Sequence, residues 1–281
     1  MNSGTVIGVG LSLGAAVVWG GGDFAGGVAA KRANVFQVVA VAHACGFGLM
    51  LLLAWLFREA IPPRVDLLWG AAAGIVGAFG ISALYTALAV GRMGVVAPVA
   101  SVVTGILPVL VGMRTEGAPG RLQLTGFVLA LVSIWMVARA DGDIDTHRGL
   151  GLAVLAGVGF GLFLVAGKQA GQHAVFWPMV AARSASTLVM LLLVVFVRTD
   201  GNALRAALTP TLLSGLGDSA GNALFVAATR HGRLDVAAVL SSLYPASTVI
   251  LARLLLKERV SPLQKAGIAG ALLSVALISA R

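Results

Sequence analysis

Charged residues are scarce in this sequence, and their scarcity excludes an ordinary water-soluble globular fold. Asp, Glu, Lys and Arg make up 11% of the 281 residues, whereas about a quarter of a soluble domain is charged. Hydrophobic residues reach 58%, and the mean hydropathy is +0.96. This composition indicates a protein that lies largely within a lipid bilayer.

Cysteine and the usual ligand-binding motifs are also lacking. Cys45 is the single cysteine, so intrachain disulfides and cysteine-ligated metal sites are excluded. The histidines show no metal-ligand spacing, and no G-x-x-x-x-G-K-[ST] loop is present, so we expect no metal, no ATP site and no other cofactor. The net charge of +9 is spread over many connections, a pattern typical of membrane-interface anchors that argues against a nucleic-acid partner.

Apolar stretches of bilayer length are what the sequence does have. The first begins at residue 5, and without a basic segment before it we interpret it as a span, not a signal peptide. The ten predicted spans are 5–29, 35–57, 67–90, 94–113, 121–138, 149–168, 174–197, 207–229, 235–256 and 262–280. Four G-x-x-x-G matches are predicted helix-packing faces: Gly22/Gly26, Gly70/Gly74, Gly157/Gly161 and Gly217/Gly221.

The two halves of the chain, 1–140 and 141–281, are weak copies of each other. The pairs that recur at a nearly constant sequence offset are Trp19-Gly20 with Phe160-Gly161, Val39-Ala40 with Val180-Ala181, Ala83-Leu84 with Ala223-Leu224, Glu116 with Glu258, and Gly126 with Gly267. Five spans per copy is an odd number, so the second copy enters the membrane from the opposite side. The prediction is an all-α membrane protein with ten transmembrane helices as two inverted-topology five-helix repeats, an architecture typical of secondary transporters.

Two motifs carry a resemblance to a known family. Residues 238–245, Ala-Val-Leu-Ser-Ser-Leu-Tyr-Pro, precede Lys257-Glu258-Arg259, and the first copy has Trp19-Gly20 and Glu116. This pattern resembles the EamA family of the drug/metabolite transporter superfamily. The first copy lacks the Tyr-Pro pair and has Val102-Val103 instead, so the two halves of a cavity should differ in shape.

The resemblance implies a multi-pass protein of the cell membrane with both termini in the cytoplasm and a central cavity between the repeats. It implies transport of a small organic metabolite or drug, and slightly favours export. Lys and Arg are divided almost evenly between the two faces, so charge alone does not encode the orientation. The expected partners are a small solute, protons and the bilayer, and a monomer is compatible with the sequence.

Two acidic residues lie near the middle of predicted spans, Asp23 in the first and Asp218 in the eighth. An ionised carboxylate at that depth is unfavourable, so such a residue usually faces a cavity or a partner. Either one could carry a proton or bind a cationic substrate group. The alternative is a structural ion pair with Arg183 or Lys168.

Other polar and aromatic side chains are candidates to line the substrate and proton site. Asn222 lies one helical turn after Asp218, and Trp19 one turn before Asp23, so each pair shares a face. Tyr85 and Tyr244 are the only tyrosines and offer an aromatic face with a hydroxyl group. Each of these four could line a cavity or pack between helices.

Three residues are candidates for gating or hinge motion. Pro245 interrupts the hydrogen-bond ladder of the ninth predicted span, which produces either a hinge or a simple kink. His43 and Arg183 fall at nearly matching places in the second and seventh spans. They could form a gate or make a structural hydrogen bond.

An alternative function is an intramembrane aspartyl protease that uses Asp23 and Asp218. Gly-Leu-Gly-Asp at 215–218 and Gly-Gly-Gly-Asp at 20–23 both fit a G-x-G-D pattern. Two carboxyl groups that share a proton can activate water. The Pro-Ala-Leu motif of such proteases is absent, however, and an inverted repeat has no role in that mechanism.

Overall fold

The computed structural model describes residues 3–115, 120–139, 148–197, 199–231, 241, 243–257 and 261–279. Every regular element in this part of the chain is a helix. The helices are α1 (Ser3–Ala30), α2 (Val35–Leu56), α3 (Arg64–Val90), α4 (Met93–Thr115), α5 (Arg121–Arg139), α6 (Leu150–Ala170), α7 (Phe176–Phe196), α8 (Gly201–Ala206), α9 (Leu208–His231), α11 (Tyr244–Leu255) and α12 (Pro262–Ser279).

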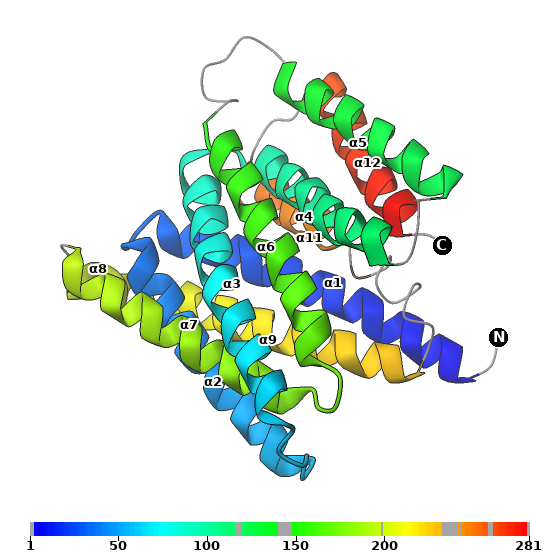
Figure 1. The fold of residues 1–281 in the computed structure, drawn as a ribbon. Coiled ribbons are helices and arrows are strands. Elements are labelled where there is room, and N and C mark those ends of the chain that lie inside the picture. The colour runs from blue at the N-terminus through cyan, green and yellow to red at the C-terminus, as the bar shows by residue number, and fades with distance from the viewer. Residues whose placement is uncertain are drawn as a thin grey trace.

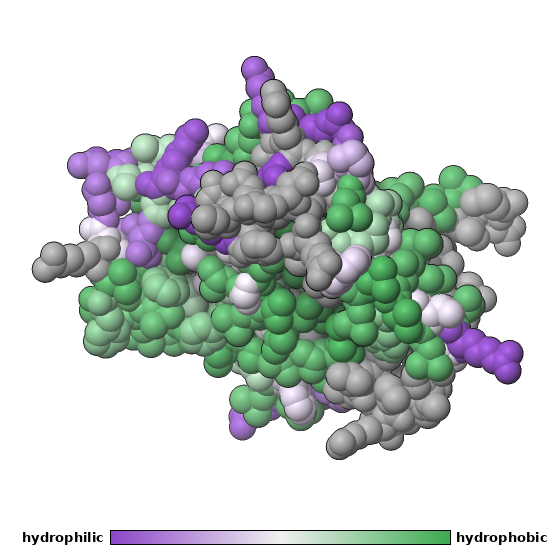
Figure 2. Space-filling view, turned by 90° about the horizontal axis from the view of Figure 1, so that it is seen from above, coloured by the Kyte–Doolittle hydropathy of each residue, from purple (hydrophilic) through white to green (hydrophobic). Residues whose placement is uncertain are grey.

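Five of the described helices are long and apolar enough to cross a bilayer. They contain the segments Val6–Ala30, Val35–Leu56, Arg64–Val90, Leu150–Gly167 and Phe176–Phe196. Shorter apolar stretches lie in α4, α5, α11 and α12. Large hydrophobic side chains point outward from many helices, as at Trp55 and Phe196, which are 74% and 84% exposed. Figure 2 shows how broadly such residues cover one face, as expected for a surface in contact with lipid.

The helix bounds agree with the predicted spans except in three places. α3 begins at Arg64, directly after Pro63, three residues earlier than predicted. The short helix α8 was not predicted, and Asp200 caps it by accepting a hydrogen bond from the Asn202 N–H at 2.8 Å. The ninth predicted span, 235–256, is described mainly from Tyr244 onward as α11. The Asp141, Asp143 and Asp145 linker lies outside the described residues.

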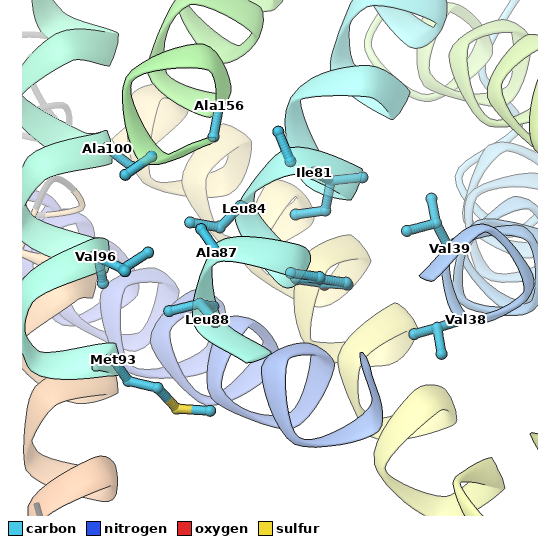
Figure 3. Packing of buried hydrophobic residues seen from close by; sticks show 14 of the residues in the cluster. Val38, Val39, Ile81, Leu84, Ala87, Leu88, Met93, Val96, Ala100 and Ala156 are labelled. Atoms are coloured by element: carbon cyan, nitrogen blue, oxygen red, sulfur yellow. The ribbon is translucent and has the colours of Figure 1, made fainter. Parts of the chain in front are cut away.

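α3 and α4 form the centre of the main hydrophobic core. Leu84, Ala87 and Leu88 on α3 lie opposite Val96 on α4 and Ala156 on α6 (Figure 3), and all of these are almost fully buried. The core is rich in Ala and Val, so the helices approach one another closely.

The four G-x-x-x-G faces are confirmed as packing faces. Each of their glycines lies where an added Cβ would press against a neighbouring helix: α1 and α9 meet at Gly22 and Gly217, and α3 meets α7 at Gly70 and Gly74. α1 and α9 run side by side across the molecule (Figure 1), and α3 lies between α6 and α7.

Contacts between the two halves recur with the halves exchanged. A Cβ at Gly80 would lie 3.3 Å from the Phe160 ring, and a Cβ at Gly221 would overlap the Trp19 ring. Phe160 is the counterpart of Trp19 in the second copy, and Gly221 is the counterpart of Gly80 at the same sequence offset. The contact between Gly221 and Trp19 is therefore equivalent to the contact between Gly80 and Phe160 when the two copies are exchanged.

A second exchanged pair lies nearby. A Cβ at Gly74 would overlap the carbonyl oxygen of Ala182, and a Cβ at Gly215 would overlap that of Ala42. Gly215 is the counterpart of Gly74 at that offset, and Ala182 matches Ala42 to within one position. Two separate contacts thus repeat with the halves exchanged, the relation expected of two copies about a pseudo-two-fold axis.

Connections that should share a membrane face lie together. The α2–α3 connection meets the α6–α7 connection, where Glu59 accepts a hydrogen bond from the Val175 N–H at 2.9 Å. A Cβ at Gly149, before α6, would lie 2.8 Å from the carbonyl oxygen of Ala87, near the end of α3. Both neighbour relations fit helices that cross the bilayer alternately up and down.

The exchanged glycine contacts predict equal sensitivity at Gly74 and Gly215. Each Gly→Ala substitution places a methyl group against a carbonyl oxygen of the facing helix, and we expect a loss of about 1–3 kcal/mol, as for an overpacked core. Thermal unfolding in detergent measures the effect. Gly48→Ala on α2 is the control, since nothing lies within 4 Å of its Cβ position. Unfolding temperatures equal to that of the control would contradict close backbone packing at these sites.

Candidate functional site

An ion pair joins two helices of the second copy. The Arg183 guanidinium on α7 donates to the Asp218 carboxylate on α9 through Nη2 and Oδ2. The Arg183 side chain is 8% exposed and that of Asp218 is 26% exposed. The ion pair with Arg183, one of the two alternatives for Asp218, is therefore present. The Lys168 side chain lies outside the described ones.

Asp23 lies beside this ion pair. α1 crosses α9 so closely that a Cβ at Gly22 would lie 3.2 Å from the Asp218 backbone nitrogen. The Asp23 side chain is partly buried and within electrostatic range of Asp218. Among the described residues it has no ion pair and no side-chain hydrogen bond. Of the two aspartates, Asp23 is thus the one without an ion-pair partner among the described residues.

Aromatic rings surround the crossing of α1 and α9. The Trp19 indole N–H donates to the carbonyl oxygen of Asp218 at 3.2 Å. The Trp19 ring centroid lies 5.8 Å from that of Phe225 and 6.4 Å from that of Tyr244, the latter in an edge-on arrangement. Tyr244, on α11, lies within electrostatic range of Asp23 and close to the Ser101 side chain on α4. The rings of α1, α9 and α11 therefore pack together one turn from Asp23.

Tyr85 fills the space on the α3 side. Its hydroxyl group donates to Ser214 Oγ on α9 at 3.2 Å, and the residue is 2% exposed. Its ring lies against Gly26 of α1, which leaves no room for a side chain there. Tyr85 thus packs between α1 and α9 while its hydroxyl group remains within electrostatic range of Asp23 and Asp218.

Asn222 and Pro245 lie at the edges of this cluster. Asn222 is partly buried on α9, one turn beyond Asp218, as expected. Pro245 lies in the first turn of α11, after the N-cap residue Leu243. A proline in this turn removes no helical hydrogen bond, because the first N–H groups of a helix have no partner within the helix. Pro245 therefore lies at the start of α11, and both the kink and the hinge stay predictions.

His43 connects α2 to α7 through Ser186. The His43 Nδ1 and Ser186 Oγ atoms are 2.8 Å apart, and Ser186 Oγ also donates to the carbonyl oxygen of Arg183 at 3.1 Å. His43 is 4% exposed. The structural hydrogen bond, one of the two alternatives for His43, is present beside Arg183, and a gating role remains untested.

Further polar atoms near Arg183 were not predicted from the sequence. Arg183 Nε, Thr187 Oγ1 and Ser219 Oγ are buried and have no hydrogen-bond partner within the described part of the chain. Arg183 Nε and Ser219 Oγ both lie within 3.5 Å of the point that a Cβ of Gly46 would occupy. Unpaired buried donors usually bind water or a ligand. The one sequence signal for this cluster was the position of Ser219 directly after Asp218 in an apolar span.

A surface groove of about 910 Å³ lies elsewhere, at the C-terminal end of α2. Its lining includes Leu52, Trp55, Arg58, Glu59 and Trp177, and neither aspartate borders it. The polar cluster around Asp23 is therefore a feature of the helix interfaces and is separate from this groove.

Apolar helices in two matching copies, with charged side chains where the copies meet, define a multi-pass membrane protein of the transporter type. The sequence profile of the EamA-like transporter family matches the chain twice, over residues 6–139 and 147–280. The chain belongs to this family. No curated protein matches the chain.

A solved structure described only as "Crystal structure of protein" has a similar fold. Its TM-score is 0.63 at 18% sequence identity, and the alignment covers 99% of this chain and 96% of the other. At this identity the match shows that the whole chain shares one fold, and nothing about substrate.

Removing Arg183 should destabilise the protein more than removing both partners of the ion pair. Arg183→Gln leaves the Asp218 carboxylate without a partner, and loss of one partner of a buried pair costs about 3–5 kcal/mol. Adding Asp218→Asn removes the stranded charge and should recover part of that loss. Denaturant unfolding of the single and double variants gives the coupling energy. Additive losses would contradict a coupled pair, and Arg64→Gln, at an exposed arginine, is the control.

Proposed function

We propose that this protein is a secondary transporter of the cell membrane that moves a small organic solute by alternating access. Ten spans form two inverted five-helix repeats, 1–140 and 141–281, and one repeat rocks against the other. The exchanged glycine contacts at Gly80 and Gly221 support this arrangement. Family membership supports transport as the activity, and the resemblance favours export as its direction.

The single observation that carries the mechanism is the carboxylate of Asp23 beside the Arg183–Asp218 ion pair. Two carboxylates and one guanidinium leave one negative charge to be balanced. A proton or a cationic group of the solute can balance it, and either would reduce the cost of an ionised acid at that depth. We assign Asp23 the role of coupling site. Asp218 holds the Arg183 side chain in position through their ion pair.

Proton binding to Asp23 can be linked to motion because of where the residue lies. Asp23 is on α1 of the first repeat, whereas Arg183 and Asp218 are on α7 and α9 of the second. A charged Asp23 attracts Arg183 and repels Asp218, and a neutral Asp23 does neither. Its protonation therefore changes the attraction between the two repeats, which is the requirement for coupling a proton to their relative movement.

Asp23→Asn should abolish proton-driven transport but preserve exchange of solute across the membrane. The amide keeps the size of the side chain and cannot take up a proton. Asp23→Glu keeps a carboxyl group and should retain coupling. The measurement is uptake into proteoliposomes, with and without a pH gradient, screened over amino acids, sugars, nucleosides and cationic drugs.

Asp23→Glu is the matched control, because it alters the same position and keeps a carboxyl group that can take up a proton. Normal gradient-driven uptake by Asp23→Asn would refute the coupling role. Loss of exchange as well as of coupling would indicate that Asp23 binds the solute itself.

The protease alternative has no support. A catalytic pair of aspartates needs two carboxyl groups that share a proton, whereas Asp218 is held by Arg183. The family to which the chain belongs consists of transporters.

The proposed topology predicts which connections share a membrane face. With both termini in the cytoplasm, cysteines at Arg64 and His173 should react from the cytoplasmic side. Cysteines at Lys31, Gly201 and Ser261 should react from the opposite side. Each is introduced singly into a Cys45→Ala background and labelled with an impermeant thiol reagent in oriented vesicles. Labelling of Arg64 and His173 from opposite sides would remove one span from the count.

A further inference from the structure

Glu59 ties the first copy of the repeat to the second at one end of the bundle. Its carboxylate accepts hydrogen bonds from the backbone N–H groups of Val175, Phe176 and Trp177 at 2.9, 2.8 and 3.0 Å. The Trp177 indole N–H donates to the carbonyl oxygen of Glu59 at 2.9 Å. One acidic residue thus makes four hydrogen bonds between the α2–α3 connection and the start of α7.

The start of α7 depends on Glu59 because α7 cannot cap itself. The N-cap residue Val175 has no side-chain acceptor, and no local cap is present. Pro178, which follows in the first turn, has no N–H group. The Glu59 carboxylate therefore binds the free donors of this turn, and its negative charge is favourable at the positive end of the helix dipole.

A second bond holds the same two connections together. The Asp66 carboxylate, 2% exposed at the start of α3, lies 2.9 Å from His173 Nδ1 and also accepts a hydrogen bond from the His173 backbone N–H at 3.3 Å. We call the contacts of Glu59 and Asp66 with residues 173–177 the first latch.

The repeat places matching residues at the other end of the bundle. At the repeat offset Asp200 is the counterpart of Glu59, and Asn34, Val35 and Phe36 are the counterparts of Val175, Phe176 and Trp177. Here the two polar residues make caps within their own copy: Asn34 caps α2 by accepting from the Phe36 N–H at 2.9 Å, and Asp200 caps α8. Asp200 is exposed. The elements of a second latch are present in an unlatched arrangement.

From this asymmetry we infer that Glu59 and Asp200 are alternating latches of the transport cycle. In the conformation seen, Glu59 holds α7 and closes the face that carries residues 57–63 and 171–175. In the opposite conformation, Glu59 releases α7, and Asp200 leaves α8 to bind the first turn of α2, near Val35 and Phe36. This inference rests on the proposed function, because inverted repeats exchange conformations when access alternates.

The exchange keeps the N-terminus of α2 bound but leaves the first turn of α7 and that of α8 without a carboxylate cap. When Asp200 moves to α2, it replaces the short-range Asn34 cap, so the α2 N-terminus is bound in both states. The Asp66–His173 bond has no equivalent, because the matching residues are Ala207 and Arg32. The first latch therefore holds more strongly than the second, and the resting protein favours the conformation seen.

Cross-linking between cysteines placed next to the latches tests the exchange, because these reporter positions leave Glu59 and Asp200 in place. Ala60→Cys with Ala174→Cys reports the first latch. Gly201→Cys with Ala33→Cys, at the corresponding positions of the other copy, reports the second. Both pairs are made in the Cys45→Ala background and treated with a short thiol-reactive cross-linker in purified, lipid-reconstituted protein.

The first pair should cross-link in the resting protein, and the second should do so poorly. Glu59→Ala should raise the yield of the second pair roughly 2- to 30-fold, the range expected when one helix cap is lost. Asp66→Asn should act in the same direction. Protein carrying both pairs should cross-link at one end or the other but never at both.

Three results would overturn the latches: a second pair that never cross-links even with Glu59→Ala, simultaneous cross-links at both ends, or equal yields with and without Glu59. Transport is measured separately. Exclusive cross-linking with no solute movement would support the latches and refute the proposed function. Solute movement in protein whose second pair never cross-links would support the proposed function and refute the latches.

Discussion

Close approach of helix backbones is the constraint on which the rest of this structure depends. Glycines on α1, α3 and α9 let carbonyl oxygens and Cα atoms of facing helices meet where a side chain would stand. Without a hydrophobic driving force between helices in lipid, such contacts and a few polar bonds hold a bundle together. They also bring Asp23 next to Asp218, because Gly22 and Gly217 meet one residue before each aspartate. The polar cluster is therefore a consequence of how α1 and α9 pack.

The charged residues of this cluster do not follow the pseudo-two-fold symmetry that relates the helix contacts of the two copies. At the repeat offset, Asp23 corresponds to Leu164, Arg183 to Ala42, and Asp218 to Gly77. None of these counterparts carries a charge. The two copies supply a nearly symmetric frame, while the charged residues occupy only one of two related positions. In the proposed mechanism, this frame adopts two equivalent arrangements, and a single coupling site encounters both in turn.

Much of the fold was predictable from the sequence, because bilayer-length apolar stretches and a repeat offset are local or periodic signals. The bounds of α2, α6 and α7 follow from them within a few residues. The partner of Asp218 could be narrowed to Arg183 or Lys168 but not chosen, since the choice depends on how α7 rotates against α9. The Glu59 cap was missed because it joins residues far apart in the chain, and nothing near Glu59 indicates which helix end it will meet. The start of α11 was missed because a proline can begin a helix as readily as bend one.

In the proposed mechanism, a charged Asp23 has a consequence for energetics across the whole membrane. An elementary charge that moves through the full membrane potential changes in energy by about 2.3 kcal/mol per 100 mV. Rocking of α1 with Asp23 ionised displaces charge within that field, whereas rocking with Asp23 neutralised by a proton displaces none from this side chain. In the proposed cycle, the membrane potential therefore acts on the half in which Asp23 is ionised and not on the other, and it contributes to the direction in which a full turnover runs.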